Sequence, residues 1–175
     1  SEAGRLLAAM IGHEPDPWTR LHASRLSGGL PAAIEAVAET VADAAVRVPS
    51  GPSGRSVAAA ETAPSSSLTE RCRAALPPAV LDALALLGVV YDCADHEFER
   101  SFGRGALAAC GALVGIDESG RVRPRSTLVA AAAVDAVPAA RPAELLAGLD
   151  ASFLGPLGRV AVADARRDPI VPDDL

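Results

Sequence analysis

The chain opens with apolar residues that recur at helical spacing. The spacing predicts two helices before residue 27 and a third that begins at Pro31. Asp16 is the expected cap of the second helix, because aspartate favours the position before a helix start. Ser27-Gly28-Gly29 is expected to end that helix, since paired glycines favour turns. Residues 1–47 are therefore predicted to form a small helical bundle.

Residues 48–67 lose the periodic pattern and are rich in Pro, Gly, Ser and Ala. Such a composition is typical of a flexible linker between domains. A further helix is expected to open at Leu68, with Ser67 or Thr69 as its cap. It should end at Pro77, because proline interrupts helices.

The apolar pattern returns strongly over residues 68–150. The run at 79–90 predicts a buried helix, and the segment 105–114 predicts a second. Residues 115–123 predict a two-stranded hairpin, because an Asp-Glu-Ser-Gly turn separates two short apolar segments. The order helix, helix, hairpin is that of a winged helix. Additional helices are predicted over 95–102, 127–137 and 141–149.

The last segment, residues 151–175, changes character again. Alternating residues at 158–163 predict one strand, and the tail from Arg166 is expected to run extended. The predicted fold class is mainly α: a helical bundle plus a winged helix with a short β-hairpin.

Composition excludes several kinds of chemistry. All sixteen basic residues are arginines, so the chain has no lysine for a Walker A loop or a Schiff base. A formal net charge of −6 disfavours a general nucleic-acid surface. Three unpatterned cysteines argue against a disulfide framework and favour a cytoplasmic location. We also expect no membrane span and no secretory signal.

Two stretches resemble a known class of proteins. Residues 26–35, Leu-Ser-Gly-Gly-Leu-Pro-Ala-Ala-Ile-Glu, resemble the Gly-x-Pro segment of the STAND class of AAA-like ATPases. Residues 76–140 resemble the winged-helix domain of large ATP-binding regulators of the LuxR type. The matching motifs are Leu76-Pro77-Pro78, Leu87-Gly88, Leu113-Val114-Gly115, the wing at 117–123, and Leu-Val-Ala-Ala-Ala at 128–132.

The resemblance implies a regulatory, non-catalytic role. It implies that an ATPase domain carrying the Walker motifs lies N-terminal to Ser1, and that residues 1–47 act as its lid. Gly29, Leu30 and Pro31 would then lie near the adenine and ribose of ATP or ADP, which would bind only together with that ATPase domain. The winged helix would close over the lid at rest and move on activation. The family often has His-Pro where this chain has Pro124-Arg125-Ser126, so nucleotide sensing by the wing is not expected to follow the family pattern.

The chemistry of the Gly29-Leu30-Pro31 segment also suggests a binding site, independently of the resemblance. A proline in the first turn leaves N–H groups and the positive end of the helix dipole facing outward, which suits a phosphate or a purine edge. The structural alternative is a helix start after a glycine turn.

Other functions compete with this hypothesis. The chain could be a stand-alone interaction module that binds a protein partner, or a DNA-binding regulator. Arg121, Arg123 and Arg125 alternate along the wing, where they would contact DNA phosphates, another domain or solvent. Because the helix at 105–114 is nearly all apolar, it cannot read bases, and direct nucleic-acid binding is not expected.

Two clusters of polar residues are candidates for a metal site and a docking surface. Cys93, His96 and Cys110 form an incomplete ligand set, so no metal site is expected. The acidic run at 92–99 is predicted to be a solvated face, with docking to a basic partner as the alternative.

Overall fold

The computed structural model describes residues 2–47 and 65–167, and the mainly α prediction is confirmed within them. Most of the predicted linker, residues 48–64, lies outside the described residues. No helix in the two described stretches is both long and apolar enough to cross a lipid bilayer.

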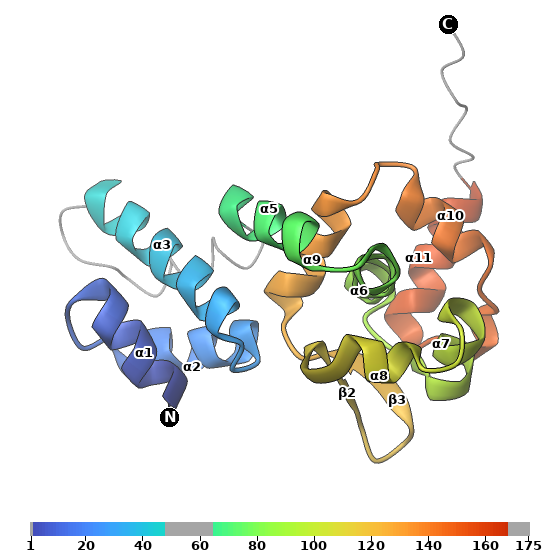
Figure 1. The fold of residues 1–175 in the computed structure, drawn as a ribbon, viewed down its shortest axis with the longest axis horizontal. Helices are drawn as coiled ribbons and strands as arrows, with labels where there is room; N and C mark the ends of the chain where they lie inside the picture. Colours follow the sequence, from blue (N-terminus) through green and yellow to red (C-terminus); the bar gives the residue numbers. More distant parts are fainter. Residues whose placement is uncertain (1, 48–64, 168–175) are drawn as a thin grey trace, which may run out of the picture.

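Three helices at the N-terminal end pack against one another, and we call them the lid (Figure 1): α1 (Glu2–Ile11), α2 (Pro17–Ser27) and α3 (Pro31–Arg47). The predicted cap of α2 is present, since Asp16 accepts hydrogen bonds from the Thr19 amide at 3.0 Å and the Thr19 hydroxyl at 2.5 Å. Leu7 and Val37 are fully buried between the three helices. The predicted bundle is therefore observed over the described residues.

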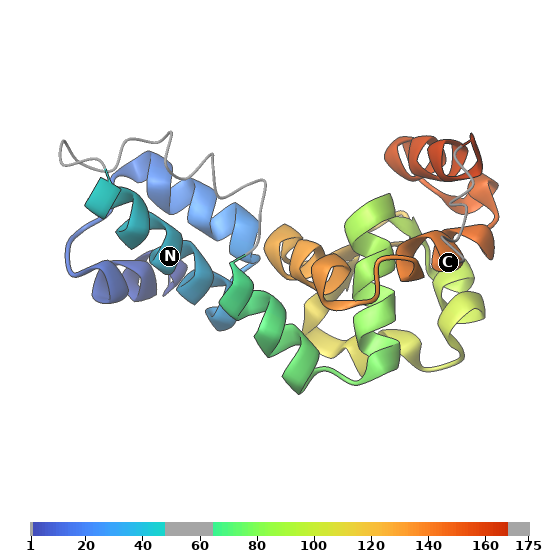
Figure 2. The same cartoon turned by 90° about the horizontal axis from the view of Figure 1, so that it is seen from above.

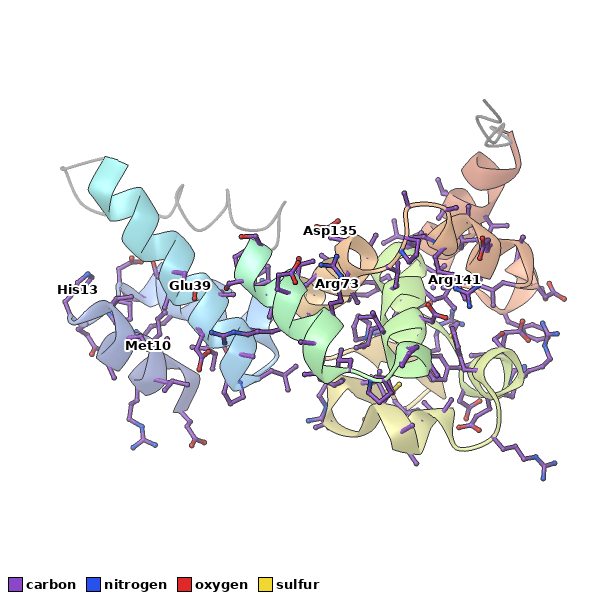
Figure 3. The ribbon with its side chains drawn as sticks, turned by 45° about the horizontal axis from the view of Figure 1, so that its top comes forward. Met10, His13, Glu39, Arg73, Asp135 and Arg141 are labelled. Atoms are coloured by element: carbon purple, nitrogen blue, oxygen red, sulfur yellow. The ribbon has the colours of Figure 1, made fainter. Side chains whose placement is uncertain are left out.

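The rest of the described chain, residues 65–167, forms a larger body that we call the winged unit. Helix α5 (Ser66–Ala75) is the first helix of this unit and lies between the lid and the other helices of the unit in both views (Figure 2). The N-cap of α5 is Ser65, which accepts from the Leu68 amide; the prediction of Ser67 or Thr69 was wrong. At its other end, Arg73 donates to the carbonyls of Asp135 and Ala136 (Figure 3).

Helices α6 (Pro78–Val90) and α9 (Thr127–Ala136) form the centre of the winged unit. Most of α6 is buried, as its continuous apolar run predicts. The two helices approach closely at Gly88, where an added Cβ would lie 2.7 Å from the Ala130 carbonyl oxygen. A glycine at this position thus lets the backbones of α6 and α9 approach closely.

The winged helix is completed by β1 (Cys93–Ala94), α7 (Asp95–Phe102), α8 (Ala106–Cys110), β2 (Val114–Ile116) and β3 (Arg121–Pro124). The strands form an antiparallel sheet in the order β1-β3-β2, with Cys93 opposite Val122 and Gly115 opposite Arg123. The predicted hairpin is confirmed. The predicted helix at 105–114 is shorter, because a 3-10 turn at Gly111–Leu113 follows α8 and leads into β2.

The C-terminal part corrects one prediction. Helices α10 (Arg141–Ala147) and α11 (Pro156–Arg167) flank a 3-10 turn at Ala151–Phe153, so the strand predicted at 158–163 is wrong. Pro156 begins α11. Gly158 lies against Val90, while Val162 is buried and Val160 faces solvent. The alternating pattern therefore reflects two faces of a helix. Residues 168–175 lie outside the described residues.

Candidate functional site

The predicted site segment, Gly29-Leu30-Pro31, forms the turn between α2 and α3. The Leu30 amide donates to the Ser27 carbonyl at 3.0 Å, and the Gly29 amide donates to the Ser27 hydroxyl at 3.2 Å. Gly29 and Pro31 are exposed, whereas Leu30 is half-buried. The turn is therefore held internally while its outer surface stays accessible.

The first turn of α3 offers fewer free N–H groups than the sequence suggested. Pro31 has none, and the Ala33 amide donates to the Leu30 carbonyl at 3.1 Å. A phosphate would therefore find little backbone support here. The exposed proline ring and the half-buried Leu30 are better suited to an apolar or planar partner.

A groove of about 220 Å³ lies directly beside this turn. Leu30, Pro31 and Ala32 form its lid side. The winged unit provides the other side, formed by Leu68, Arg71, Cys72, Ala75, Leu76, Leu113 and Val129. Burial raises the pKa of the Cys72 thiol, so this side chain stays protonated and behaves as an apolar group. At the groove, Arg71 pairs with Glu35 of α3, so its charge is already matched.

The lid and the winged unit meet next to the groove in a contact that the sequence did not predict. Ser126 is buried and donates its hydroxyl to the Leu26 carbonyl at 2.7 Å. Its oxygen also accepts from the Val129 amide at 3.1 Å and so caps α9. One hundred residues separate the two partners, and no local pattern indicates such a pairing.

The three wing arginines are all engaged within the chain. Arg121 pairs with Asp92, and Arg123 pairs with Asp117 at 3.0 Å. The guanidinium of Arg125 donates to the Val114 carbonyl at 3.3 Å. These arginines support the base of the wing, so contact with DNA phosphates would compete with existing bonds.

The wing turn itself is organised by Asp117. Its carboxylate accepts from the Ser119 amide at 2.9 Å and from the Arg121 amide at 3.0 Å. Hydrogen bonds to the Asp117 carboxylate lower its pKa, mainly the bond from the Ser119 hydroxyl and then those from the backbone amides. The Asp-Glu-Ser-Gly-Arg motif of the wing is thus explained by local turn chemistry.

The acidic run at 92–99 is not a uniformly solvated face, so that prediction was wrong. Asp92 is 8 % exposed and Glu97 is 1 % exposed. Glu97 accepts from the Arg100 guanidinium, with Nε at 2.7 Å, and from the Asp150 amide at 3.3 Å. The Arg100 hydrogen bond is the main reason that the pKa of Glu97 lies below its ordinary value. These carboxylates connect the turn before α11 to the winged helix.

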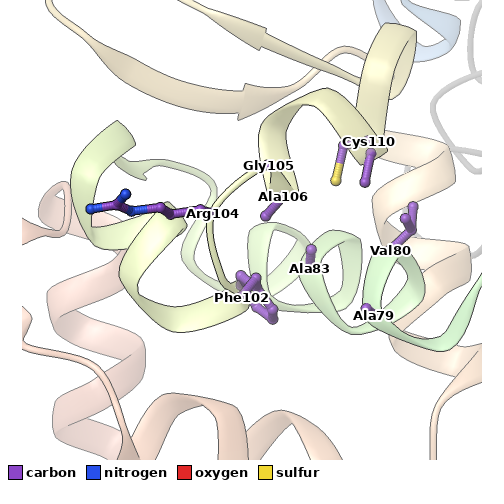
Figure 4. A pocket seen from close by; sticks show the side chains of 9 residues that line it. Ala79, Val80, Ala83, Phe102, Arg104, Gly105, Ala106 and Cys110 are labelled. Atoms are coloured by element: carbon purple, nitrogen blue, oxygen red, sulfur yellow. The ribbon is translucent and has the colours of Figure 1, made fainter.

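Two remaining features show no chemistry of their own. A hollow of about 160 Å³ lies between α6 and α8, and its lining includes four alanines together with Val80, Phe102 and Cys110 (Figure 4). Arg104 at its rim extends away from it (Figure 4). Within residues 2–47 and 65–167, no three His, Cys, Asp or Glu side chains are grouped as a metal site would require. Burial raises the pKa of Cys93 to about 12, which makes it a poor thiolate donor.

No protein-family model, no curated protein and no solved structure matches this chain.

Proposed function

We propose that this chain is the non-catalytic regulatory portion of a STAND-type ATPase or LuxR-like transcriptional regulator, in which nucleotide state changes how the lid lies on the winged unit. The observation that carries this proposal is the position of Pro31. It stands at the start of α3, on the apolar groove that the lid shares with the winged unit. A ligand bound here would touch both bodies.

The chemistry of the groove suits one part of a nucleotide better than the others. Its surface is almost entirely apolar, which favours a flat base over a charged phosphate. The phosphates would be held by the ATPase domain, because this chain has no lysine and the Ala33 amide is already bonded. The residues of this chain would bind and orient the base, and a neighbouring domain would perform any hydrolysis.

The conformational step follows from differential contact. A ligand shifts an equilibrium only if it binds one arrangement more tightly than the other. Leu30 and Pro31 belong to the lid, whereas Leu113 and Val129 belong to the winged unit. A ligand that touches both sides binds the closed arrangement more tightly, and its loss or exchange favours opening.

The DNA-binding alternative receives little support. The wing arginines Arg121 and Arg123 are paired with Asp92 and Asp117. The exposed positions of α8 are Ala108 and Ala109, which have no groups that hydrogen-bond to base edges.

A protein-interaction module is the second candidate, and exposed apolar side chains favour it. Leu6, Met10 and Leu21 of the lid are 37 %, 42 % and 46 % exposed. In the first proposal, the ATPase domain covers this surface. In the second, an independent partner covers it.

The deciding experiment compares two prolines that both begin helices. The polypeptide that includes the expected ATPase domain is prepared as wild type, Pro31→Ala and Pro156→Ala, and its affinity for a fluorescent ADP analogue is measured. Pro31→Ala should weaken binding roughly threefold to tenfold, or about 0.7–1.4 kcal/mol, because apolar contact with the base is lost. Pro156 begins α11, which does not line the groove, so Pro156→Ala should leave the affinity for the ADP analogue unchanged.

The sequence encoded upstream of Ser1 supplies an independent check. A Walker A motif there supports the first proposal. Its absence, together with no ADP binding, would reject the first proposal in favour of the interaction module.

A further inference from the structure

We infer that the surface around α8 docks an amphipathic helix of a partner protein, which carries two large apolar residues one turn apart and an acidic residue in an adjacent turn. We call this the α8 surface. It consists of the hollow between α6 and α8, a neighbouring hollow that shares Phe102 with the first, and Arg104. The inference goes beyond the proposed function, because no residue of the α8 surface lines the groove beside Pro31.

The hollow between α6 and α8 has an apolar wall and no reactive group (Figure 4). Val80, Ala83 and Cys110 are buried in its lining. Burial raises the pKa of the Cys110 thiol, so this side chain stays protonated and adds apolar surface. The volume of the hollow is about 160 Å³, whereas pockets for cofactors and drug-sized ligands measure about 300–1,000 Å³. The hollow therefore has room for one apolar side chain.

A second hollow, of about 190 Å³, adjoins the first, and Phe102 lines both. Its other apolar lining comes from Leu86 and Leu145. Ala83 of the first hollow and Leu86 of the second lie about 4.5 Å apart along the axis of α6, because each helical residue adds about 1.5 Å. Residues three or four positions apart on one face of a partner helix have a similar spacing. Two adjoining hollows thus favour a helical peptide over a single small molecule.

The acidic groups on this surface are already bound within the chain. Glu99 accepts hydrogen bonds from the Gly105 amide at 2.6 Å and from the Leu107 amide at 3.1 Å, at the start of α8. In the second hollow, Glu144 pairs with Arg141 at 2.8 Å. Neither carboxylate therefore serves as a counter-ion for Arg104.

Arg104 is the charge that a partner can match. Arg100 lines the second hollow, but it is bound to Glu97. Arg104 is exposed at the rim of the first hollow, and its side chain forms no ion pair or hydrogen bond with the residues that the structure describes. Gly103 and Gly105 on either side have φ of +91° and +89° in open space, so they shape the turn that presents it. A carboxylate on the partner would complete this pair and fix its register.

The two exposed alanines of α8 provide a matched test of the hollow. Ala109 lines the first hollow, whereas its neighbour Ala108 does not. Leucine at position 109 would fill the mouth of the hollow, and leucine at position 108 adds the same volume outside it. Because both positions are exposed, both variants should fold like the wild type, which the melting temperature checks.

The probe is a displayed library of random peptides, about 16 residues long. The library is first depleted on Ala109→Leu and then selected on the wild-type chain of 175 residues. The enriched peptides should carry two large apolar residues three or four positions apart, with Asp or Glu in an adjacent turn. Measured by fluorescence anisotropy, their affinity should fall about tenfold or more for Ala109→Leu and at most about twofold for Ala108→Leu.

The charge is tested by Arg104→Glu, with Arg159→Glu as its control. Arg159 is exposed on α11 and lines neither hollow. Selection on Arg104→Glu should place Lys or Arg where the wild type selects an acidic residue, and selection on Arg159→Glu should retain the acidic residue. The inference would be overturned if no peptide remained after depletion, if Ala108→Leu and Ala109→Leu bound the peptides equally, or if Arg104→Glu selected the same acidic sequences.

Discussion

The lid and the winged unit differ in the size of the apolar core that each one builds. In the winged unit, large side chains from several elements are fully buried together: Leu84, Leu87, Phe98 and Leu154. The lid has a thinner interior around Leu7 and Val37, and it leaves Leu6, Met10 and Leu21 substantially exposed. The winged unit also exposes large apolar side chains, namely Tyr91, Ile116, Leu157 and Val160, so the two bodies differ in the size of the buried core rather than in exposed apolar surface.

This difference indicates where a neighbour is needed. A domain with a large shared core is stable alone, while a small bundle with an exposed apolar face gains stability by covering it. The lid is also joined to the winged unit chiefly by the hydrogen bond from Ser126 to Leu26 and along α5. A body that is weakly attached and incompletely covered is suited to move between partners.

The largest effect should come from the core of the winged unit. Phe98→Ala removes a ring that is 0 % exposed and packs against Phe102 at 5.1 Å between centroids. We expect the free energy of unfolding to fall by about 3–5 kcal/mol, measured by urea denaturation. Met10→Ala in the lid is the control and should lower the free energy of unfolding by less than about 1 kcal/mol. Similar losses at both sites would remove the contrast between the two bodies.

Much of this architecture could be predicted because local chemistry determines it. Prolines begin α2, α3 and α6, and the wing turn follows from Asp117 and Gly120. The short strand β1 could not be predicted, because a strand of two residues shows no periodic pattern in the sequence. The alternation of Val160 and Val162 predicts a strand, but this segment forms helix α11 because it packs against Val90.

The candidate site could be predicted only in part. Gly29, Leu30 and Pro31 are contiguous, and their turn was visible in the sequence. The groove and the hydrogen bond that joins the lid to the winged unit depend on residues that lie about a hundred positions apart, such as Leu26 and Ser126. The burial of Asp92 and Glu97 also depends on distant partners, namely Arg121 and the Asp150 amide.

An intermediate effect on stability is expected at Glu97, which accepts a hydrogen bond from the Asp150 amide in the turn before α11. Because the folded pKa of Glu97 lies below its unfolded value, its contribution is complete above about pH 4.5 and is lost as pH falls through the folded pKa. Glu97→Gln should lower the melting temperature at pH 7 by roughly 2–6 °C and flatten its decline below pH 4.5.

The control for Glu97 is an ion pair of the same spacing on the surface. Glu70 pairs with Arg73 three residues on, and both are exposed. Glu70→Gln should leave the melting temperature nearly unchanged. Equal shifts for the two variants would show that burial of Glu97 adds nothing.

The smallest effect on stability should come from the exposed face of the lid. Leu6→Ser changes a side chain that is 37 % exposed, so unfolding free energy should change by less than about 0.5 kcal/mol. The same variant should reduce binding of a hydrophobic dye to the folded chain, because it removes exposed apolar surface. A large loss of stability without any change in dye binding would mean that Leu6 serves the lid interior.

The most direct test of the central claim is the distance between the lid and the wing in two nucleotide states. Spin labels are attached through unnatural amino acids at the exposed positions His13 and Glu118, in the polypeptide that includes the proposed ATPase domain. We predict one distance distribution with ADP and a different, longer one with a non-hydrolysable ATP analogue. We also predict that Gly28→Ala shifts the ADP distribution toward the longer one, because a Cβ at this position would lie 1.8 Å from the Arg125 carbonyl oxygen of the winged unit. Identical distributions in both nucleotide states would contradict the claim that this chain converts nucleotide state into movement of the lid.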